Sequence, residues 1–298
     1  MINIEKIDTF AGHRDCVYAL AAHEGGFFSA GGDGFIIDWK LNRPDLGSVV
    51  ARMKHSIYAM AFDENRKELY VAENFEGIHV IDIGHKSETK SLKLSDAAIF
   101  DLKIIGDTIF VAGGDGVLSI IDKTSFSFRK HIKFANKSIR RLAFHHPSKN
   151  IWAACSDGNL YEISTKNFEL ISSIDAHSNS VFGLTFTDNY SQLISVGRDA
   201  QLKVWQVKDG SNLHSIPAHL FAINDVAVNP QNGLLATCSM DKTIKIWDGA
   251  TFKLLKVIDK ARHANHGTSI NALRWISEKI LVSVSDDKLI SVWKIEQL

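Results

Sequence analysis

The sequence has 298 residues, which is long enough to bury a sizeable hydrophobic core without disulfide bonds. Lysine plus arginine equals aspartate plus glutamate at 34 residues each, so no overall charge attracts nucleic acid or an anionic membrane surface. Cys16, Cys155 and Cys238 are far apart and odd in number, which predicts neither a disulfide framework nor a cysteine metal site.

The N-terminal region lacks the features of a targeting segment. Residues 1–10 have neither the basic region nor the apolar run of a signal peptide, and no window approaches 18 uninterrupted apolar residues. We therefore expect a cytoplasmic protein that does not insert into a membrane. The composition does not shift along the chain, so residues 1–298 are expected to form a single domain.

One unit is repeated from end to end, most clearly at residues 236–248, which read ATCSMDKTIKIWD. Apolar and polar residues alternate before a polar break at residues 241–243 and a β-rich run follows it, which is typical of a β-hairpin. Seven equivalent segments, 40 to 46 residues apart, end at Trp39, Ile81, Ile121, Ile163, Trp205, Trp247 and Trp293. A period of about 40 to 45 residues with a Trp-Asp ending is typical of a four-stranded propeller blade.

On these residues the whole chain resembles the WD-repeat family. The resemblance implies an all-β fold, namely a single seven-bladed β-propeller of four-stranded antiparallel blades. Segments such as 168–175 and 252–258 would form outer strands. The chain ends five residues after Trp293, so we expect residues 2–10 to supply the outer strand of the seventh blade and to close the ring.

In chain order, the copies differ in their polar residues. A histidine opens most copies, at His13, His55, His177, His219 and His266, whereas the third and fourth have Ser95 and Ala135 at that position. The second copy is the most degenerate, because Phe75 stands at the turn where the sixth copy has Asp241.

The resemblance also implies a buried His-Ser-Asp-Trp network within a blade. The two full sets are His219, Ser239, Asp241 and Trp247, and His266, Ser285, Asp287 and Trp293. Gly31 and Gly197 stand at the serine position of the first and fifth copies, so smaller networks are expected there. A catalytic Ser-His-Asp triad uses the same residue types, but a set that recurs from blade to blade indicates scaffolding. The close histidine pairs lack further ligands at a suitable spacing, so we expect no metal and no cofactor.

In WD-repeat proteins that bind peptides, two positions of each repeat commonly lie around the mouth of the central channel. The first position follows the first strong apolar residue of the inner strand and gives Tyr18, Tyr58, Phe100, Arg140, Phe182, Asn224 and Asn271. The second precedes the turn aspartate and gives Gly32, Gly114, Ser156, Arg198, Met240 and Asp286, of which the last three are added to the predicted binding residues. The small residues beside the aromatic ones would leave room for a ligand. Two interpretations remain open: the large side chains plug the channel, or they form an aromatic platform for a partner.

Residues 129–141 contain six basic residues and no acidic one, so one side of the mouth, with Arg140, Arg141 and Arg198, is expected to be basic. Asp225 and Asp286 are expected to make the sixth and seventh blades more acidic. A solvated face is the plainer explanation of the basic run, and recognition of an acidic or phosphorylated partner is the alternative.

The sequence therefore predicts a non-enzymatic scaffold that binds a protein or peptide at the channel mouth and acts as a subunit of a larger complex. A propeller enzyme of the hydrolase or lyase type, with a site in the channel, is the alternative, and it would need convergent titratable groups there. Nucleic-acid binding would combine stacking aromatic residues with basic ones, and the zero net charge argues against it.

Overall fold

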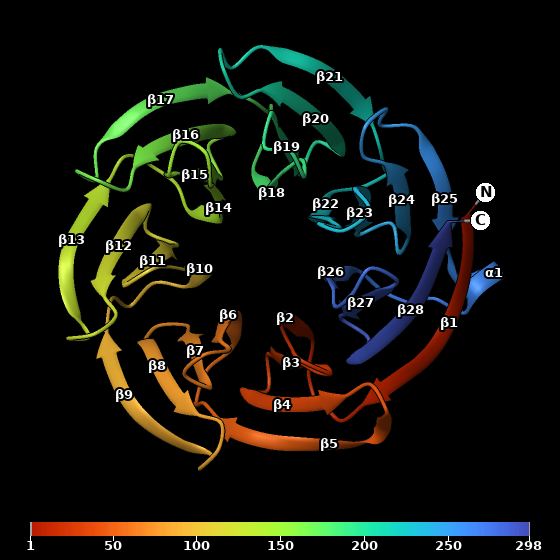
Figure 1. Ribbon diagram of the computed structural model, residues 1–298, viewed down its shortest axis with the longest axis horizontal. Helices are drawn as coiled ribbons and strands as arrows, with labels where there is room; N and C mark the ends of the chain where they lie inside the picture. The colour runs from red at the N-terminus through yellow and green to blue at the C-terminus, as the bar shows by residue number, and fades with distance from the viewer. Residues whose placement is uncertain (1, 298) are drawn as a thin grey trace.

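The computed structural model describes residues 2–297, apart from the side chains of residues 44–46. Seven four-stranded antiparallel sheets stand in a ring around a central channel (Figure 1). The predicted all-β fold with seven four-stranded blades is confirmed.

Six blades are built from consecutive strands, which follow one another from the channel outwards. Blade one contains β2 (Val17–His23), β3 (Gly26–Gly31), β4 (Phe35–Lys40) and β5 (Arg43–Arg52). Blade two contains β6 (Ile57–Asp63), β7 (Glu68–Glu73), β8 (Gly77–Asp82) and β9 (Ser87–Lys93). Blade three contains β10 (Ile99–Ile105), β11 (Thr108–Gly113), β12 (Val117–Asp122) and β13 (Ser127–Lys133). Blade four contains β14 (Ile139–His145), β15 (Asn150–Cys155), β16 (Asn159–Ser164) and β17 (Leu170–Asp175).

Blade five contains β18 (Val181–Phe186), β19 (Gln192–Gly197), β20 (Gln201–Gln206) and β21 (Asn212–Pro217). Blade six contains β22 (Ile223–Val228), β23 (Leu234–Ser239), β24 (Ile244–Asp248) and β25 (Leu254–Ile258). A one-turn helix, α1 (Lys260–His263), follows blade six and begins after the capping residue Asp259. Blade seven contains β26 (Ile270–Trp275), β27 (Ile280–Ser285) and β28 (Leu289–Gln297), with β1 (Ile2–Ala11) as its outer strand.

The N-terminal strand closes the ring, as predicted. β1 pairs antiparallel with β28, from Ile2 opposite Gln297 to Ala11 opposite Leu289, so the two ends of the chain lie side by side (Figure 1). Phe10 also packs on blade one, with its ring 5.3 Å from that of Trp39. The pairing leaves β28 without an open edge on this side.

The hydrophobic core lies between neighbouring blades. The two middle strands are the most apolar, and every residue of β3 and β23 is buried, whereas outer strands such as β17 and β21 are mainly exposed. One cluster joins Ile36 of blade one to Ile57 and Leu69 of blade two, and similar clusters follow around the ring. Full burial of each such side chain contributes about 1.5–3 kcal/mol.

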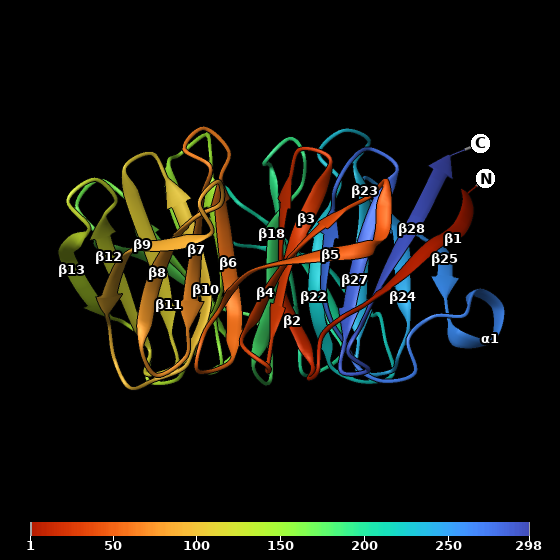
Figure 2. The same cartoon turned by 90° about the horizontal axis from the view of Figure 1, so that it is seen from below.

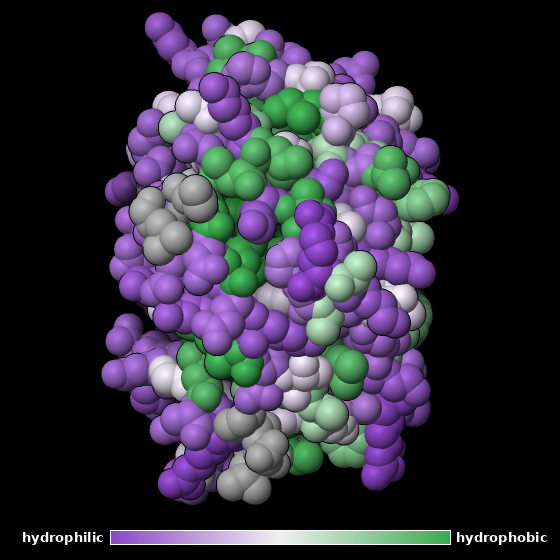
Figure 3. Space-filling view, turned by 90° about the vertical axis from the view of Figure 1, so that its right-hand side faces the viewer, coloured by the Kyte–Doolittle hydropathy of each residue, from purple (hydrophilic) through white to green (hydrophobic). Residues whose placement is uncertain are grey.

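The outer wall is formed by the fourth strands and is mainly hydrophilic. Figure 3 shows this wall on the side of blades six and seven, with hydrophobic side chains among the polar ones. Ile7 on β1 and Leu254 and Leu255 on β25 are among the exposed apolar residues of the outer strands.

The blades give the central channel two different openings. Because all seven blades have the same strand order, their inner strands run in the same direction between the two faces of the ring (Figure 2). We call the opening where the inner strands begin the first mouth; residues such as Tyr18 and Phe100 lie there. The opening where they end, near residues 103–106, is the second mouth.

Candidate partner-binding site

The residues predicted to surround the channel mouth do lie together. A cavity of about 530 Å³ opens at the first mouth, and its lining contains nine of the ten predicted residues, namely Tyr18, Tyr58, Phe100, Arg140, Phe182, Arg198, Asn224, Met240 and Asn271. Asp286, the tenth, lies behind the lining and accepts a hydrogen bond from Asn271 Nδ2 at 2.8 Å. Arg141 and Ala222 complete the lining.

A β-bulge places the first of the two predicted positions in each blade. The pairing of the two innermost strands shifts at this residue in all seven blades, for example between Val17 and Ala19 and between Ile99 and Asp101. A bulge leaves one residue unpaired and redirects its side chain. Seven side chains therefore converge on the mouth although they come from seven different sheets.

Aromatic and guanidinium groups form a continuous wall across blades one to five. The ring of Tyr18 meets that of Tyr58 edge to face at 4.9 Å, and Tyr58 stacks on Phe100 at 5.7 Å with an interplanar angle of 2°. The guanidinium of Arg140 lies 3.7 Å from the centre of the Phe100 ring and 5.0 Å from that of Phe182. All five side chains are half-buried, so the wall is solvent-facing on one side only.

Small residues beside this wall keep it open. Gly114, which precedes a turn aspartate, packs against Phe100, and a Cβ atom there would lie 3.3 Å from Phe100 Cε2. The same Cβ would lie 3.0 Å from Ala98 O, so a larger side chain would have to displace the backbone or the ring.

Arg140 is a cation without a counter-ion in the described part of the chain. Its guanidinium makes the two aromatic contacts but neither a hydrogen bond nor an ion pair with any described residue. Burial, together with the charge of Arg141, lowers the pKa of Arg140 to about 10, so it stays charged at neutral pH. Arg198 lies exposed on blade five, and its side chain likewise pairs with no described carboxylate. The mouth therefore offers two free guanidinium groups.

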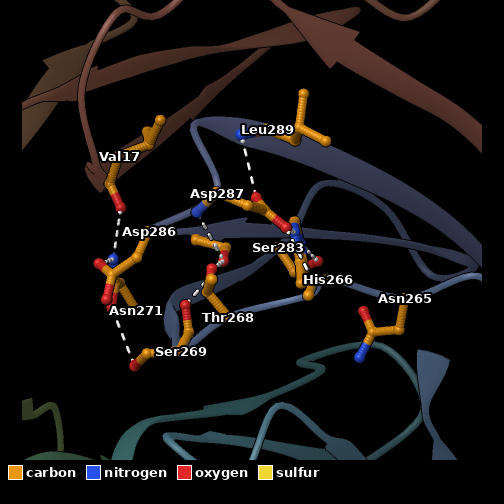
Figure 4. Close-up of polar contacts among 12 residues, drawn as sticks. Val17, Asn265, His266, Thr268, Ser269, Asn271, Ser283, Asp286, Asp287 and Leu289 are labelled. Atoms are coloured by element: carbon orange, nitrogen blue, oxygen red, sulfur yellow. Dashed lines mark hydrogen bonds and ion pairs between the residues drawn. The ribbon is translucent and has the colours of Figure 1, made fainter.

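The two asparagines of the ring connect blades. Asn224 Nδ2 donates to Ser269 Oγ (3.0 Å) and to Ile270 O (2.8 Å), which joins blade six to blade seven. Asn271 Nδ2 donates to Val17 O at 3.0 Å as well as to Asp286, which joins blade seven to blade one (Figure 4). The structure thus uses the amide donors of both residues to hold the mouth in shape.

The predicted division of the mouth into a basic and an acidic side is wrong in one respect. Arg141 and Asp225 lie deeper in the channel and pair with each other, with Arg141 Nη2 2.7 Å from Asp225 Oδ1. They come from blades four and six, so the opposite charges compensate across the channel, although Arg141 still lines the first-mouth cavity.

An apolar rim beside the cavity was missed by the sequence prediction. Leu220 is 85% exposed, Phe221 62% and Met240 53%. They adjoin the lining, because Ala222 follows Phe221 and its carbonyl accepts a hydrogen bond from Met240 N at 3.0 Å. The signal was present in the sequence, since blade one has Arg14-Asp15 and blade five Ser178-Asn179 where blade six has Leu220-Phe221.

A buried polar network holds the two hairpins of a blade together in blades one, five, six and seven. In blade six, Trp247 Nε1 donates to Thr237 Oγ1 (2.9 Å), which lies 2.8 Å from His219 Nε2. His219 Nδ1 lies 2.9 Å from Asp241 Oδ2. The equivalent hydroxyl residues of the other three blades are Ser29, Ser195 and Ser283.

These hydroxyls correct the predicted composition of the network, which placed them two residues later. Ser239 and Ser285 are not members, and instead each donates to a backbone carbonyl, of Phe221 at 3.1 Å and of Ser269 at 2.7 Å. The expectation of smaller networks in the first and fifth copies is also wrong. Gly31 and Gly197 do not occupy the hydroxyl position, and the networks of blades one and five are complete.

The networks have the residue types of a Ser-His-Asp triad but not its accessibility. The four hydroxyl residues, Ser29, Ser195, Thr237 and Ser283, are each 0% exposed. A substrate cannot reach them, and each hydroxyl already binds an indole N–H. The networks are structural.

Blade two departs from this pattern, as its sequence indicates. Phe75 occupies the turn with a φ of 66° and is 49% exposed. Glu73 replaces the missing turn carboxylate by accepting a hydrogen bond from His55 N at 2.7 Å.

Comparison with known proteins agrees with the repeat and the fold. The family described as "WD domain, G-beta repeat" matches residues 168–206 and 210–248. Each match comprises four strands, β17–β20 in the first and β21–β24 in the second. The crystal structure of the WD40 beta propeller domain of Doa1 superposes with a TM-score of 0.88 at 18% identity, covering 99% of this chain and 97% of that chain. No curated protein sequence matches the chain.

Within residues 2–297, no helix is long and apolar enough to cross a membrane. Nor do three or more His, Cys, Asp or Glu side chains in this range gather in a way that suits a metal ion.

Proposed function

This chain forms a WD40-type β-propeller, and from that premise we propose that it is a non-catalytic scaffold that binds a protein or peptide at the first mouth of its channel. The observation that carries the proposal is Arg140, a charged guanidinium held between two phenylalanine rings with no acceptor among the described residues. The fold supports the general expectation of an interaction surface, and the aromatic and guanidinium groups of the first mouth indicate which kind of partner it binds.

The aromatic wall has the properties of an interface hot spot. Large rigid rings and arginine dominate such sites, because they bury much area while losing little conformational entropy. Tyr18, Tyr58 and Phe100 are already ordered against one another. A partner that covers them therefore gains contact without having to immobilise them.

The free charges and the apolar rim define the partner. Arg140 and Arg198 favour a carboxylate of the partner, because a guanidinium binds a carboxylate through two parallel hydrogen bonds. Leu220, Phe221 and Met240 favour an apolar side chain next to it. We infer a segment in which an acidic residue lies close to a large apolar one.

Peptide display on the folded full-length chain tests this proposal. A random peptide library is selected on the immobilised protein, and the affinities of the enriched peptides are measured by fluorescence anisotropy. We expect a motif that combines an acidic with a large apolar residue. Because hot-spot truncation removes about 2 kcal/mol or more, Phe100→Ala or Arg140→Met is expected to weaken binding about 30-fold.

Leu255→Ala on the outer wall is the matched control and is expected to bind the same peptides normally. Thermal melts of all variants verify that they are folded. The proposal fails if the selected peptides bind the Phe100 and Arg140 variants as tightly as the unaltered chain. If the side chains only plug the channel, these variants lose stability and no selected peptide responds to them.

Two wider expectations belong to the same proposal. A reducing compartment such as the cytoplasm suits the free thiols of Cys16, Cys155 and Cys238. A scaffold of this kind acts through other proteins, so we propose that it works as a subunit of a larger complex.

A further inference from the structure

A second cavity, of about 720 Å³, opens at the second mouth and has a different chemistry from the first. Its lining comes from the last residues of the inner strands and the loops that follow them in blades three to seven. Small residues such as Gly106, Ala143 and Ala227 contribute to the wall, which leaves room in the channel. This volume lies within the range of small-molecule sites, about 300–1,000 Å³.

Three cations point into this cavity. Lys103, Arg141 and Arg274 all belong to its lining and come from blades three, four and seven. The acidic residues of the lining are Asp225, which lies inside the channel, and Asp188, which lies at the exposed rim. Asp101, next to Lys103, is the other carboxylate of the channel interior.

Both interior carboxylates accept hydrogen bonds from backbone N–H groups. Asp101 accepts hydrogen bonds from Leu102 N and from Leu142 N, each at 2.8 Å, and so joins blade three to blade four. Asp225 accepts from Leu273 N at 3.0 Å in addition to Arg141. Their oxygens hold neighbouring blades together, so part of their capacity to accept hydrogen bonds is used by the backbone.

Lys103 and Arg274 consequently have unused donors. Arg274 Nε is buried without a hydrogen-bond partner, and the only bond of this guanidinium to described residues runs from Nη2 to Leu20 O at 3.5 Å. Lys103 Nζ is 3.9 Å from Asp101 Oδ2, which is too long for a hydrogen bond. Buried polar groups are normally paired, so the buried Arg274 Nε indicates a missing acceptor, whereas the Lys103 side chain is 32% exposed and its ammonium group is open to the channel.

Lys103 and the charged groups around it also show an excess of positive over negative groups. Asp101 raises the pKa of Lys103, but burial and the charges of Arg274 and Arg141 outweigh it, so the pKa lies below its usual value. For Arg274, burial has the largest effect and also lowers the pKa. A bound anion would relieve the repulsion between the cations.

We propose that the second-mouth cavity binds a small anion with at least two negative charges, carried by phosphate or carboxylate groups, and that Lys103 and Arg274 are its ligands. Arg141 is paired with Asp225, which compensates its charge, so Lys103 and Arg274 supply the uncompensated positive charge. The site lies at the other end of the channel from the aromatic wall. Arg141 lines both cavities, but the proposed ligands Lys103 and Arg274 do not line the first, so the proposal does not depend on the function proposed for the first mouth.

Calorimetric titration of the full-length chain with pyrophosphate and, separately, with citrate tests the site, in a chloride buffer without other polyanions. We expect saturable binding of at least one of them, and the stronger ligand identifies the preferred group. Arg274→Met and Lys103→Met remove the charge while keeping most of the side-chain volume. Each is expected to weaken binding about tenfold or more, because a hydrogen bond to a charged group is lost.

Arg198→Met, which removes a cation at the first mouth, is the matched control and is expected to bind the anion normally. Two variants are used so that the site remains testable if one of them does not fold, as judged by its melt. Absence of binding of both anions to the unaltered chain overturns the proposal. Unchanged affinity in the folded Lys103 and Arg274 variants, or loss of affinity in the Arg198 control, overturns it as well.

Discussion

The hydroxyl of Thr237 provides the sharpest test of the corrected network in blade six. Its oxygen accepts a hydrogen bond from Trp247 Nε1 and contacts His219 Nε2 at 2.8 Å. His219 Nδ1 faces Asp241 and therefore carries the ring proton, so Nε2 is an acceptor and the threonine O–H donates to it. Replacement of Thr237 by valine keeps the shape of the side chain but removes both bonds.

The expected loss of stability follows from the two buried polar groups that the substitution leaves without a hydrogen bond. The indole N–H of Trp247 and Nε2 of His219 remain buried with no partner, and each such group costs about 1–3 kcal/mol. We therefore expect Thr237→Val to lower the free energy of unfolding by about 2–6 kcal/mol. For a chain of this size this corresponds to a fall of roughly 4–12 °C in the melting temperature.

Urea unfolding followed by tryptophan fluorescence, together with calorimetry, measures this loss. Thr237→Ser is the matched control, since it keeps the hydroxyl and loses one methyl group, which contributes about 0.8 kcal/mol. The reasoning is refuted if valine is tolerated as well as serine at this position. It is also refuted if Ser239→Ala destabilises the protein more than Thr237→Val does.

Two further predictions concern closure and pH. Deletion of residues 1–9 removes most of β1 and exposes the edge of β28, so the melting temperature is expected to fall sharply; an unchanged melt contradicts the closed ring. Acidification from pH 7 to about 2 is expected to lower stability in thermal melts. The pKa of His219 is lowered mainly by burial, so this loss begins below the unfolded value of about 6.5. The pKa of Asp199 is lowered because His177 outweighs burial, which adds a loss below about pH 4, and a pH-independent melt contradicts both assignments.

The fold was predictable because its repeat unit is visible in the sequence. The alternation of apolar residues around a turn aspartate and the spacing of about 40 residues together specify the hairpins and the number of blades. Closure by residues 2–10 followed from the absence of an outer strand after Trp293. The pattern is strong because every blade has to bury the same faces against its neighbours.

The network hydroxyl was misplaced because side chains on a strand alternate with a period of two. Thr237 and Ser239 point to the same face of β23, and both carry a hydroxyl. Only the register decides between them: Leu235 is paired with Trp247, which brings the indole over Thr237 rather than Ser239. Because the register depends on how two strands pair, it cannot be predicted from the sequence of either strand alone.

The positions of the residues around the first mouth were predictable from the sequence, but the contacts that their side chains make were not. The sequence placed Arg140 and Arg141 side by side, and only the structure shows that one stacks on Phe100 while the other pairs with Asp225 in the channel. That second contact joins blades four and six, which no local pattern encodes. The cluster of basic side chains at the second mouth was missed for the same reason, since Lys103 and Arg274 lie in different blades.

The pairing of β1 with β28 also has a consequence for how the chain folds. Each of blades one to six is made of consecutive strands, so its strand pairing is local in the sequence, whereas blade seven needs the first and the last strand of the described chain. Contacts between such distant segments form slowly. During synthesis, the backbone groups of β1 therefore stay bonded to water until β28 has emerged, and we expect closure of the ring to be a late step in folding.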